Sequence, residues 1–234
     1  MSIRKKILAI SIGPVLVLGI ITLLFMLTMV KSSLMDEVQD ALKGTAAATL
    51  AAYDQNTGDY LESTNGDIWK GSYNISKSES LVDRIKENTG MDVTFFYGNK
   101  RIMTSALDKK GNRILGSEAG ERVVNQVIKG KKPFFSTNVS LDGTRNYGYF
   151  IPVYQNGTTD QVIGMVFVGT NKAQKDAIVN KILGSIMMAL LVVMFLCIVT
   201  AMRMAASISK NIKNSVAVVG KLADGDLNVW RSEE

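Results

Sequence analysis

Hydrophobic residues are concentrated in two uncharged runs, residues 7–30 and 182–202, which enclose a segment of mixed polarity, residues 31–181. The runs contain 24 and 21 residues. Because an α-helix rises about 1.5 Å per residue, each run is long enough to cross a hydrocarbon core of roughly 30 Å. The pattern therefore predicts two transmembrane helices with a folded segment between them.

Basic residues flank the two runs on the sides away from the central segment: Arg4, Lys5, Lys6, Arg203, Lys210 and Lys213. The positive-inside rule then places both termini in the cytoplasm and the central segment outside. We therefore expect a multi-pass protein of the cell membrane with two spans. A cleavable signal peptide is the alternative for the first run, which follows a basic cluster. That run exceeds the usual h-region, and no A-x-A-like site lies just after it.

The resulting organisation has five parts: a cytoplasmic N-terminus at 1–6, spans at 7–30 and 182–202, an extracytoplasmic domain at 31–181 and a cytoplasmic segment at 203–234. The helical pattern of the first run continues past it, because apolar positions such as Leu34, Val38 and Leu42 recur at spacings of three, four and seven. We expect this helix to reach about Asn56, or as far as Leu61. Its alanines can pack closely on the following sheet or on a second copy of the chain.

The rest of the extracytoplasmic domain alternates between strand and helix patterns. They predict a helix at 79–88, strands at 91–97 and 100–106, a helix at 118–129, and strands at 133–140, 145–154 and 161–170. Turn signals at Gly98-Asn99, Asp142-Gly143 and Asn156-Gly157 make neighbouring strands antiparallel. Strands in runs with segregated helices predict an α+β fold with an antiparallel sheet of about five strands. Residues 172–181 then restart a helix that enters the second span.

Composition argues against several classes of function. The formal net charge of +6 lies mainly at the ends, since residues 31–181 carry 19 Lys and Arg against 17 Asp and Glu, so no basic arm for nucleic acid is present. The sequence has no histidine, no phosphate-binding glycine loop and no G-x-S-x-G motif, and the single cysteine, Cys197, lies in the second run. We expect no enzyme, no catalytic residues, no metal site and no cofactor.

The segment after the second run resembles part of a HAMP signalling module. Apolar residues continue a helical stripe there, and the sequences at 208–212 and 222–227 resemble the first HAMP helix and the start of its connector, although Asn211 stands where that family usually has proline. The resemblance implies a partial HAMP module at 203–234.

The stretch 91–170 resembles a single Cache domain, most clearly at residues 93–97, 101–105, 147–153 and 162–169. A span, a Cache domain, a span and a HAMP module in this order resemble the N-terminal half of a bacterial methyl-accepting chemotaxis protein. The resemblance implies a PAS-like Cache fold, a homodimer, and a receptor that senses a small extracellular solute for chemotaxis. It also implies a chemotaxis kinase and adaptor as partners wherever a C-terminal signalling domain is present.

The sequence ends at Glu234, within the predicted connector. We expect either a fragment or truncated gene product, or a receptor without an output of its own. The same arrangement of spans and extracytoplasmic domain also fits the sensor half of a membrane histidine kinase or of a cyclic-dinucleotide enzyme. A structural membrane protein without a ligand is a further alternative.

Candidate ligand-binding residues come from the predicted strands and their turns. Arg101 is the first choice to pair with a ligand carboxylate, because its planar fork forms two parallel hydrogen bonds. Strand alternation predicts that Arg101, Met103 and Ser105 share one face and that Phe95 and Tyr97 share one. The alternative is that the aromatic members form the core. The full set is Phe95, Tyr97, Arg101, Met103, Thr104, Ser105, Asn138, Tyr147, Tyr149, Phe150 and Pro152.

Overall fold

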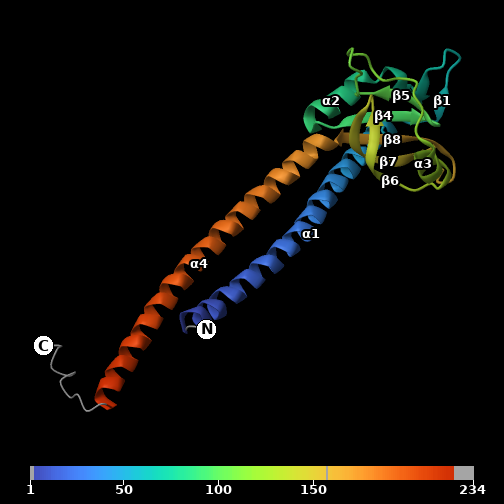
Figure 1. Cartoon of the computed structure of the whole chain (residues 1–234). Coiled ribbons are helices and arrows are strands. Elements are labelled where there is room, and N and C mark those ends of the chain that lie inside the picture. Colours follow the sequence, from blue (N-terminus) through green and yellow to red (C-terminus); the bar gives the residue numbers. More distant parts are fainter. Residues whose placement is uncertain (1–2, 157, 224–234) are drawn as a thin grey trace. The chain divides into compact units, whose positions relative to one another are not determined.

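The computed structural model describes residues 3–156 and 158–223 (Figure 1). Two compact units emerge from the contacts: a central unit, Ser32–Val179, and a second unit formed by Met1–Lys31 with Asn180–Glu234. Part of the predicted HAMP connector, including Gly225, and Gly157 of the predicted turn lie outside the described residues.

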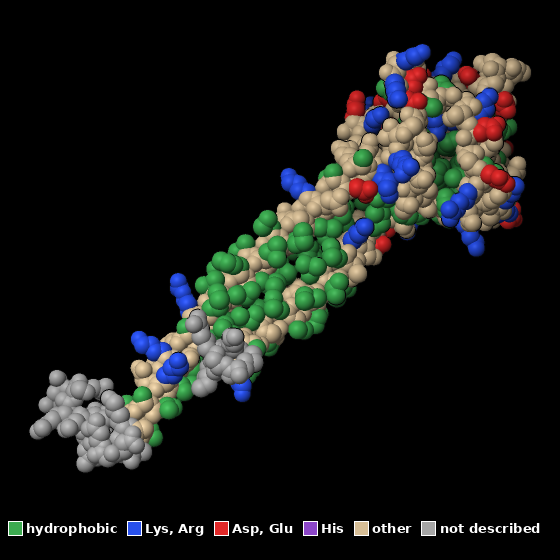
Figure 2. All heavy atoms as spheres, viewed as in Figure 1, with side chains coloured by type: hydrophobic (Ala, Val, Ile, Leu, Met, Phe, Trp, Pro, Cys, Tyr) green, Lys and Arg blue, Asp and Glu red, His purple; other side chains and the backbone are tan. Residues whose placement is uncertain are grey.

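Two long helices flank the central unit in sequence, α1 (Ile3–Asp54) and α4 (Lys172–Ala223). Both contain stretches long and apolar enough to cross a membrane. Large apolar side chains are exposed along them, including Phe25 at 62% and Phe195 at 64%. Figure 2 shows hydrophobic side chains gathered over these helices, whereas charged side chains of both signs are spread over the central unit. An exposed apolar surface of this extent suits a lipid environment rather than water.

The core of the central unit is a five-stranded antiparallel sheet, as the sequence predicts. Its strands are β4 (Asp92–Tyr97), β5 (Lys100–Thr104), β6 (Phe134–Leu141), β7 (Thr144–Tyr154) and β8 (Val162–Asn171). They lie in the order β5-β4-β8-β7-β6, so the last strand is central and leads directly into α4. Figure 1 shows the strands of this sheet together at the C-terminal end of α1.

One face of the sheet packs against α1 and α2 (Glu79–Thr89). Leu42, Ala46 and Tyr53 of α1 and Val82 of α2 are fully buried in this core. Helix α2 ends as predicted at Gly90, which adopts φ of 69° and donates its N–H to the Lys86 carbonyl.

A small sheet that the sequence did not predict follows α1: β1 (Tyr60–Glu62), β2 (Ile68–Lys70) and β3 (Tyr73–Asn74), with a short helix η1 (Ile75–Lys77) after it. The expectation of a helix reaching Leu61 is therefore wrong, because α1 ends at Asp54. The strand places the buried Tyr60 ring parallel to Phe95 at 5.8 Å between centroids. Gly71 permits a tight turn here, since a Cβ on it would meet the Thr57 carbonyl oxygen at 1.8 Å.

The opposite face is covered by a short helical segment, α3 (Glu121–Val123) and the π-helical turn η2 (Val124–Lys129). The predicted helix at 118–129 is thus correct in place but begins at Glu121, because residues 117–120 are not helical. Buried Val127 packs on this face with Phe96, Phe150 and Phe167. The two faces of the sheet therefore have separate cores.

Register shifts interrupt the alternation of side chains in three strand pairs, β4–β5, β6–β7 and β7–β8. In the β4–β5 pair, Phe95 lies opposite Met103 but Phe96 lies opposite Arg101, so Ile102 is the extra residue. The bulge places Met103 in the core beside α1 and Arg101 on the other face beside Phe96. The prediction that Arg101 and Met103 share a face is wrong for this reason, whereas Phe95 and Tyr97 do share one.

Candidate functional site

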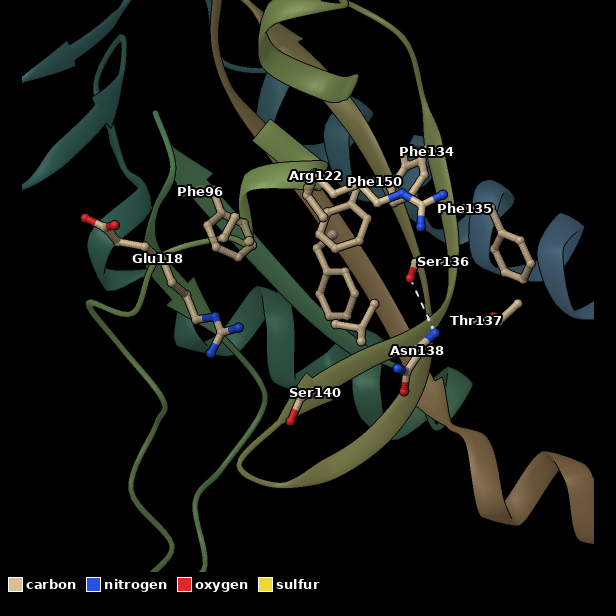
Figure 3. Close-up of a pocket in the computed structure, with 16 residues that line it drawn as sticks. Phe96, Glu118, Arg122, Phe134, Phe135, Ser136, Thr137, Asn138, Ser140 and Phe150 are labelled. Atoms are coloured by element: carbon tan, nitrogen blue, oxygen red, sulfur yellow. Dashed lines mark hydrogen bonds between the residues drawn. The ribbon is translucent and has the colours of Figure 1, made fainter. Parts of the chain in front are cut away.

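A pocket of about 530 Å³ lies on the face of the sheet opposite α1, under the α3 segment. Residues from β4, β5, β6, β7, β8 and the segment 118–123 line it (Figure 3). Its volume is in the range of small-molecule sites, which run from roughly 300 to 1,000 Å³. We take this pocket as the candidate binding site.

The floor of the pocket is a row of phenylalanines that crosses four strands. Phe134 of β6 lies opposite Phe150 of β7, which lies opposite Phe167 of β8. Their ring centroids are 6.4 Å and 4.7 Å apart. Phe96 of β4 extends the row toward β5. Gly148 leaves space for the Phe167 ring, since a Cβ at this position would meet that ring at 2.5 Å.

Arg101 lies at the β5 end of this row and is only 8% exposed. Its guanidinium carbon is 5.4 Å from the centroid of the Phe96 ring, and Nη1 donates a hydrogen bond to the Ile114 carbonyl at 3.3 Å. Burial lowers the pKa of Arg101, and the charge of Asp92 partly opposes that effect. The group nevertheless stays charged at neutral pH, because arginine ionises far above it.

The charge of Arg101 has no ion-pair partner among the residues that the structure describes. Its Nε is buried and forms no hydrogen bond within the same residues. A buried charge and an unsatisfied donor both cost free energy. The pocket therefore contains a cation whose natural complement is an anion.

Two further charged residues stand at the rim. The exposed Arg122 of α3 lies above Phe134, with its guanidinium carbon 5.4 Å from the ring centroid. Glu118 is also exposed, and Figure 3 shows its carboxylate directed away from the phenyl rings. Two arginines and one glutamate give the lining a net positive charge.

Strand β6 supplies the polar groups of the pocket. Its bulge sets Thr137 and Asn138 against Tyr147 alone, between the pairs Ser136–Gly148 and Val139–Asn146. Ser136, Thr137, Asn138 and Ser140 all line the pocket. Figure 3 shows the hydrogen bond in which the Asn138 backbone N–H donates to Ser136 Oγ at 3.3 Å. Hydroxyl and amide groups of this kind can orient a ligand.

Three of the eleven predicted residues line this pocket, Arg101, Asn138 and Phe150. Four lie in the core on the other face of the sheet: Phe95, Met103, Tyr147 and Tyr149. Tyr97 packs against that core.

The remaining three predicted residues are held within the protein. Thr104 Oγ1 bonds to Thr94 Oγ1 at 2.7 Å, and Ser105 Oγ accepts the Val93 N–H. Pro152 is buried in β7. The structure thus brings Arg101, Asn138 and Phe150 together and separates them from the other eight.

The aromatic residues that sequence reasoning missed are Phe96, Phe134 and Phe167. Each of these residues stands at an alternating position of a predicted strand, so the sequence pattern did indicate a shared face. Which face of the sheet each residue occupies depends on the bulges. Arg122 was also missed, because a basic residue on an amphipathic helix usually signals only a solvated face.

An antiparallel five-stranded sheet with a long N-terminal helix on one face and a pocket on the other is a PAS-like fold. Residues 73–182 match the protein family described as single Cache domain 3. The central part of the chain therefore has a fold of the single Cache type, and two helices long and apolar enough to span a membrane flank it in sequence.

Among solved structures, the chain is similar to an extracellular ligand binding receptor from Desulfohalobium retbaense DSM5692. The two share 14% sequence identity at a TM-score of 0.44 over 63% of this chain. The chain spans only 25% of the length of that receptor. No curated protein matches the sequence.

Proposed function

We propose that the chain is a membrane receptor whose Cache domain binds a small organic anion outside the cell and passes the signal to a partial HAMP module for chemotaxis. The observation that carries the ligand assignment is Arg101, which is buried in a pocket without a carboxylate partner among the described residues. A ligand carboxylate would supply that partner and could accept two parallel hydrogen bonds from the guanidinium.

A route from the pocket to α4 runs along β7. Phe150 faces the pocket, whereas Tyr147, three residues earlier, faces the other way. The Tyr147 hydroxyl donates to Asp176 Oδ1 and accepts from Lys172 Nζ at 3.1 Å, and both partners lie in the first turns of α4. Movement of β7 on ligand binding would therefore displace the first turns of α4, the helix that contains the second predicted span. The size of the response is limited by the difference in ligand affinity between the two states.

The membrane placement, the dimer and the chemotaxis output belong to the same proposal. The exposed apolar surfaces of α1 and α4 support two spans, and the basic flanks support cytoplasmic termini. Gly44, Ala48 and Ala51 are exposed on α1 and leave room for close approach of a second copy. The chemotaxis output rests on the resemblance of residues 203–234 to a HAMP module. A membrane histidine kinase or a cyclic-dinucleotide enzyme with the same sensor half is the alternative to a chemotaxis receptor.

Replacement of Arg101 tests the ligand assignment. We expect Arg101→Met in the full chain, held in lipid nanodiscs, to abolish the stabilisation that small carboxylates give to the wild type in thermal unfolding. The unfolding temperature without ligand should not fall, because the substitution removes an uncompensated buried charge.

The matched control is Arg145→Met, since Arg145 is exposed beside the Asp142-Gly143 turn. This variant should respond to carboxylates like the wild type. Retained stabilisation in Arg101→Met would refute the assignment, and a large loss of basal stability would make Arg101 a structural residue.

A further inference from the structure

We infer that the ligand is an aromatic monocarboxylate, with its carboxylate on Arg101 and its ring against the phenylalanine row. This inference rests on the proposed function and narrows it to one class of organic anion. Three features of the pocket carry it: the composition of the floor, the number of unpaired cations and the net charge of the lining.

The floor favours an aromatic body. Phe96, Phe134, Phe150 and Phe167 cross the sheet from β4 to β6, and polar side chains enter mainly from the edge strand β6. Phe134 is the half-buried member and stands at the open edge of the row, where its ring can meet a ligand ring. Aromatic pairs gain free energy beyond that of the area they bury. A short polar acid would leave this floor without apolar contact.

The cations favour a single carboxylate. Arg101 is 8% exposed and has no carboxylate partner among the described residues, so its charge favours one anionic group within the pocket. Arg122 is exposed and is therefore solvated without a ligand. A second carboxylate at the rim would gain little from a hydrated arginine. The two arginines and Glu118 give the lining one excess positive charge, which a monoanion neutralises.

Calorimetric titration of the full chain in nanodiscs with four probes tests the inference: phenylacetate, phenylacetamide, acetate and succinate. Phenylacetate should bind at least about tenfold more tightly than phenylacetamide, which lacks the charge, because a hydrogen bond to a charged group contributes that much. It should also exceed acetate and succinate by at least about tenfold, because only its ring covers the floor.

The outcomes separate this inference from the proposed function. Binding of acetate or succinate as tightly as phenylacetate overturns the aromatic class but leaves an anion receptor. Binding of phenylacetamide as tightly as phenylacetate overturns the role of Arg101, and with it both proposals. Binding of none of the four probes also counts against both.

A pair of variants locates the ring. Phe134→Leu should weaken phenylacetate binding by roughly two- to tenfold and leave acetate binding unchanged, because an aromatic contact is lost. Phe95→Leu is the control, since Phe95 does not line the pocket and packs with Tyr53 and Tyr60 in the core on the other face of the sheet. Thermal unfolding without ligand checks that both variants fold. An equal or larger loss of phenylacetate affinity in Phe95→Leu would overturn the placement.

Discussion

Arg101 and Arg113 are both at least partly buried in the Cache domain, but only Arg113 has a carboxylate partner among the described residues. Arg113 forms two hydrogen bonds with the Asp83 carboxylate, at 2.9 and 2.6 Å, and a third with the Thr104 carbonyl at 2.7 Å. Arg101 has one long hydrogen bond and an unpaired Nε. The fold supplies a carboxylate for the planar guanidinium of Arg113 and none, among the described residues, for that of Arg101. The residue type alone did not distinguish the two.

The Asp83–Arg113 pair predicts an acid-sensitive contribution to stability. Hydrogen bonding from Arg113 lowers the pKa of Asp83. The contribution is therefore present above the ordinary pKa of an aspartate, about 3.9, and is lost as the pH falls through the lowered value. Because both side chains are partly exposed, we expect Asp83→Asn to cost about 1 kcal/mol at neutral pH.

Denaturant unfolding of the full chain at pH 7 and pH 3 measures this contribution. The gap between wild type and Asp83→Asn should shrink at pH 3. Glu87→Gln is a control on the same helix, because Glu87 forms no ion pair among the described residues. A gap that stays constant with pH would contradict the assigned pair.

At the level of elements, hydrophobic periodicity was enough to place the two long helices, α2 and all five strands of the main sheet. The small sheet β1–β3 was missed because its strands contain only two or three residues, too few for alternation to be visible. The start of α3 was placed three residues early because Glu118 and Ala119 are good helix formers, whereas residues 118–120 are not helical in the structure.

The candidate site was less predictable because it depends on register. The Asp142-Gly143 turn pairs Leu141 with Thr144, and an unbroken ladder from there would set Phe135 opposite Phe150. The bulge at Thr137 and Asn138 shifts the pairing by one, so Phe134 faces Phe150 and joins the pocket floor. The bulge at Ile102 likewise places Arg101 on the pocket face of the sheet. Neither bulge has a sequence signal of its own here.

The contact between β7 and α4 predicts a measurable coupling. Tyr147→Phe removes the hydroxyl that donates to Asp176 and accepts from Lys172, and should lower the free energy of unfolding by about 1–2 kcal/mol. Tyr149→Phe is the control on the same face, because the Tyr149 hydroxyl forms no hydrogen bond within the described residues. Denaturant unfolding of the full chain measures both. Equal losses in the two variants would contradict the coupling.

The same contact gives an alkaline signature. Burial raises the pKa of Tyr147 to about 12, and the hydrogen bond to Asp176 acts in the same direction. The folded state then holds its proton more tightly than the unfolded state, so stability is full below pH 10 and falls between pH 10 and 12. The wild type should lose its advantage over Tyr147→Phe in this interval.

At the scale of the whole molecule, the proposed receptor has three parts: apolar helices that cross the membrane, a Cache domain outside, and a cytoplasmic segment that receives the signal. The ligand pocket and the contact to α4 lie on opposite faces of the same sheet, and β7 belongs to both. The first and last residues of the central unit both lie in the long helices. In the proposed receptor, ligand binding would therefore act on α1 and α4 through the sheet.

Cysteine labelling in intact cells tests the central claim most directly, because it reports the side of the membrane and the occupied pocket together. Single cysteines replace Ser140 in the pocket, Thr64 in the β1–β2 turn and Ser207 beyond the second apolar run, in a Cys197→Ala chain. A membrane-impermeant maleimide should label the first two in intact cells and the third only after permeabilisation. Phenylacetate should slow labelling at residue 140 and leave residue 64 unchanged. Labelling of residue 207 but not 64 in intact cells would contradict the account, as would an unchanged rate at residue 140 with saturating ligand.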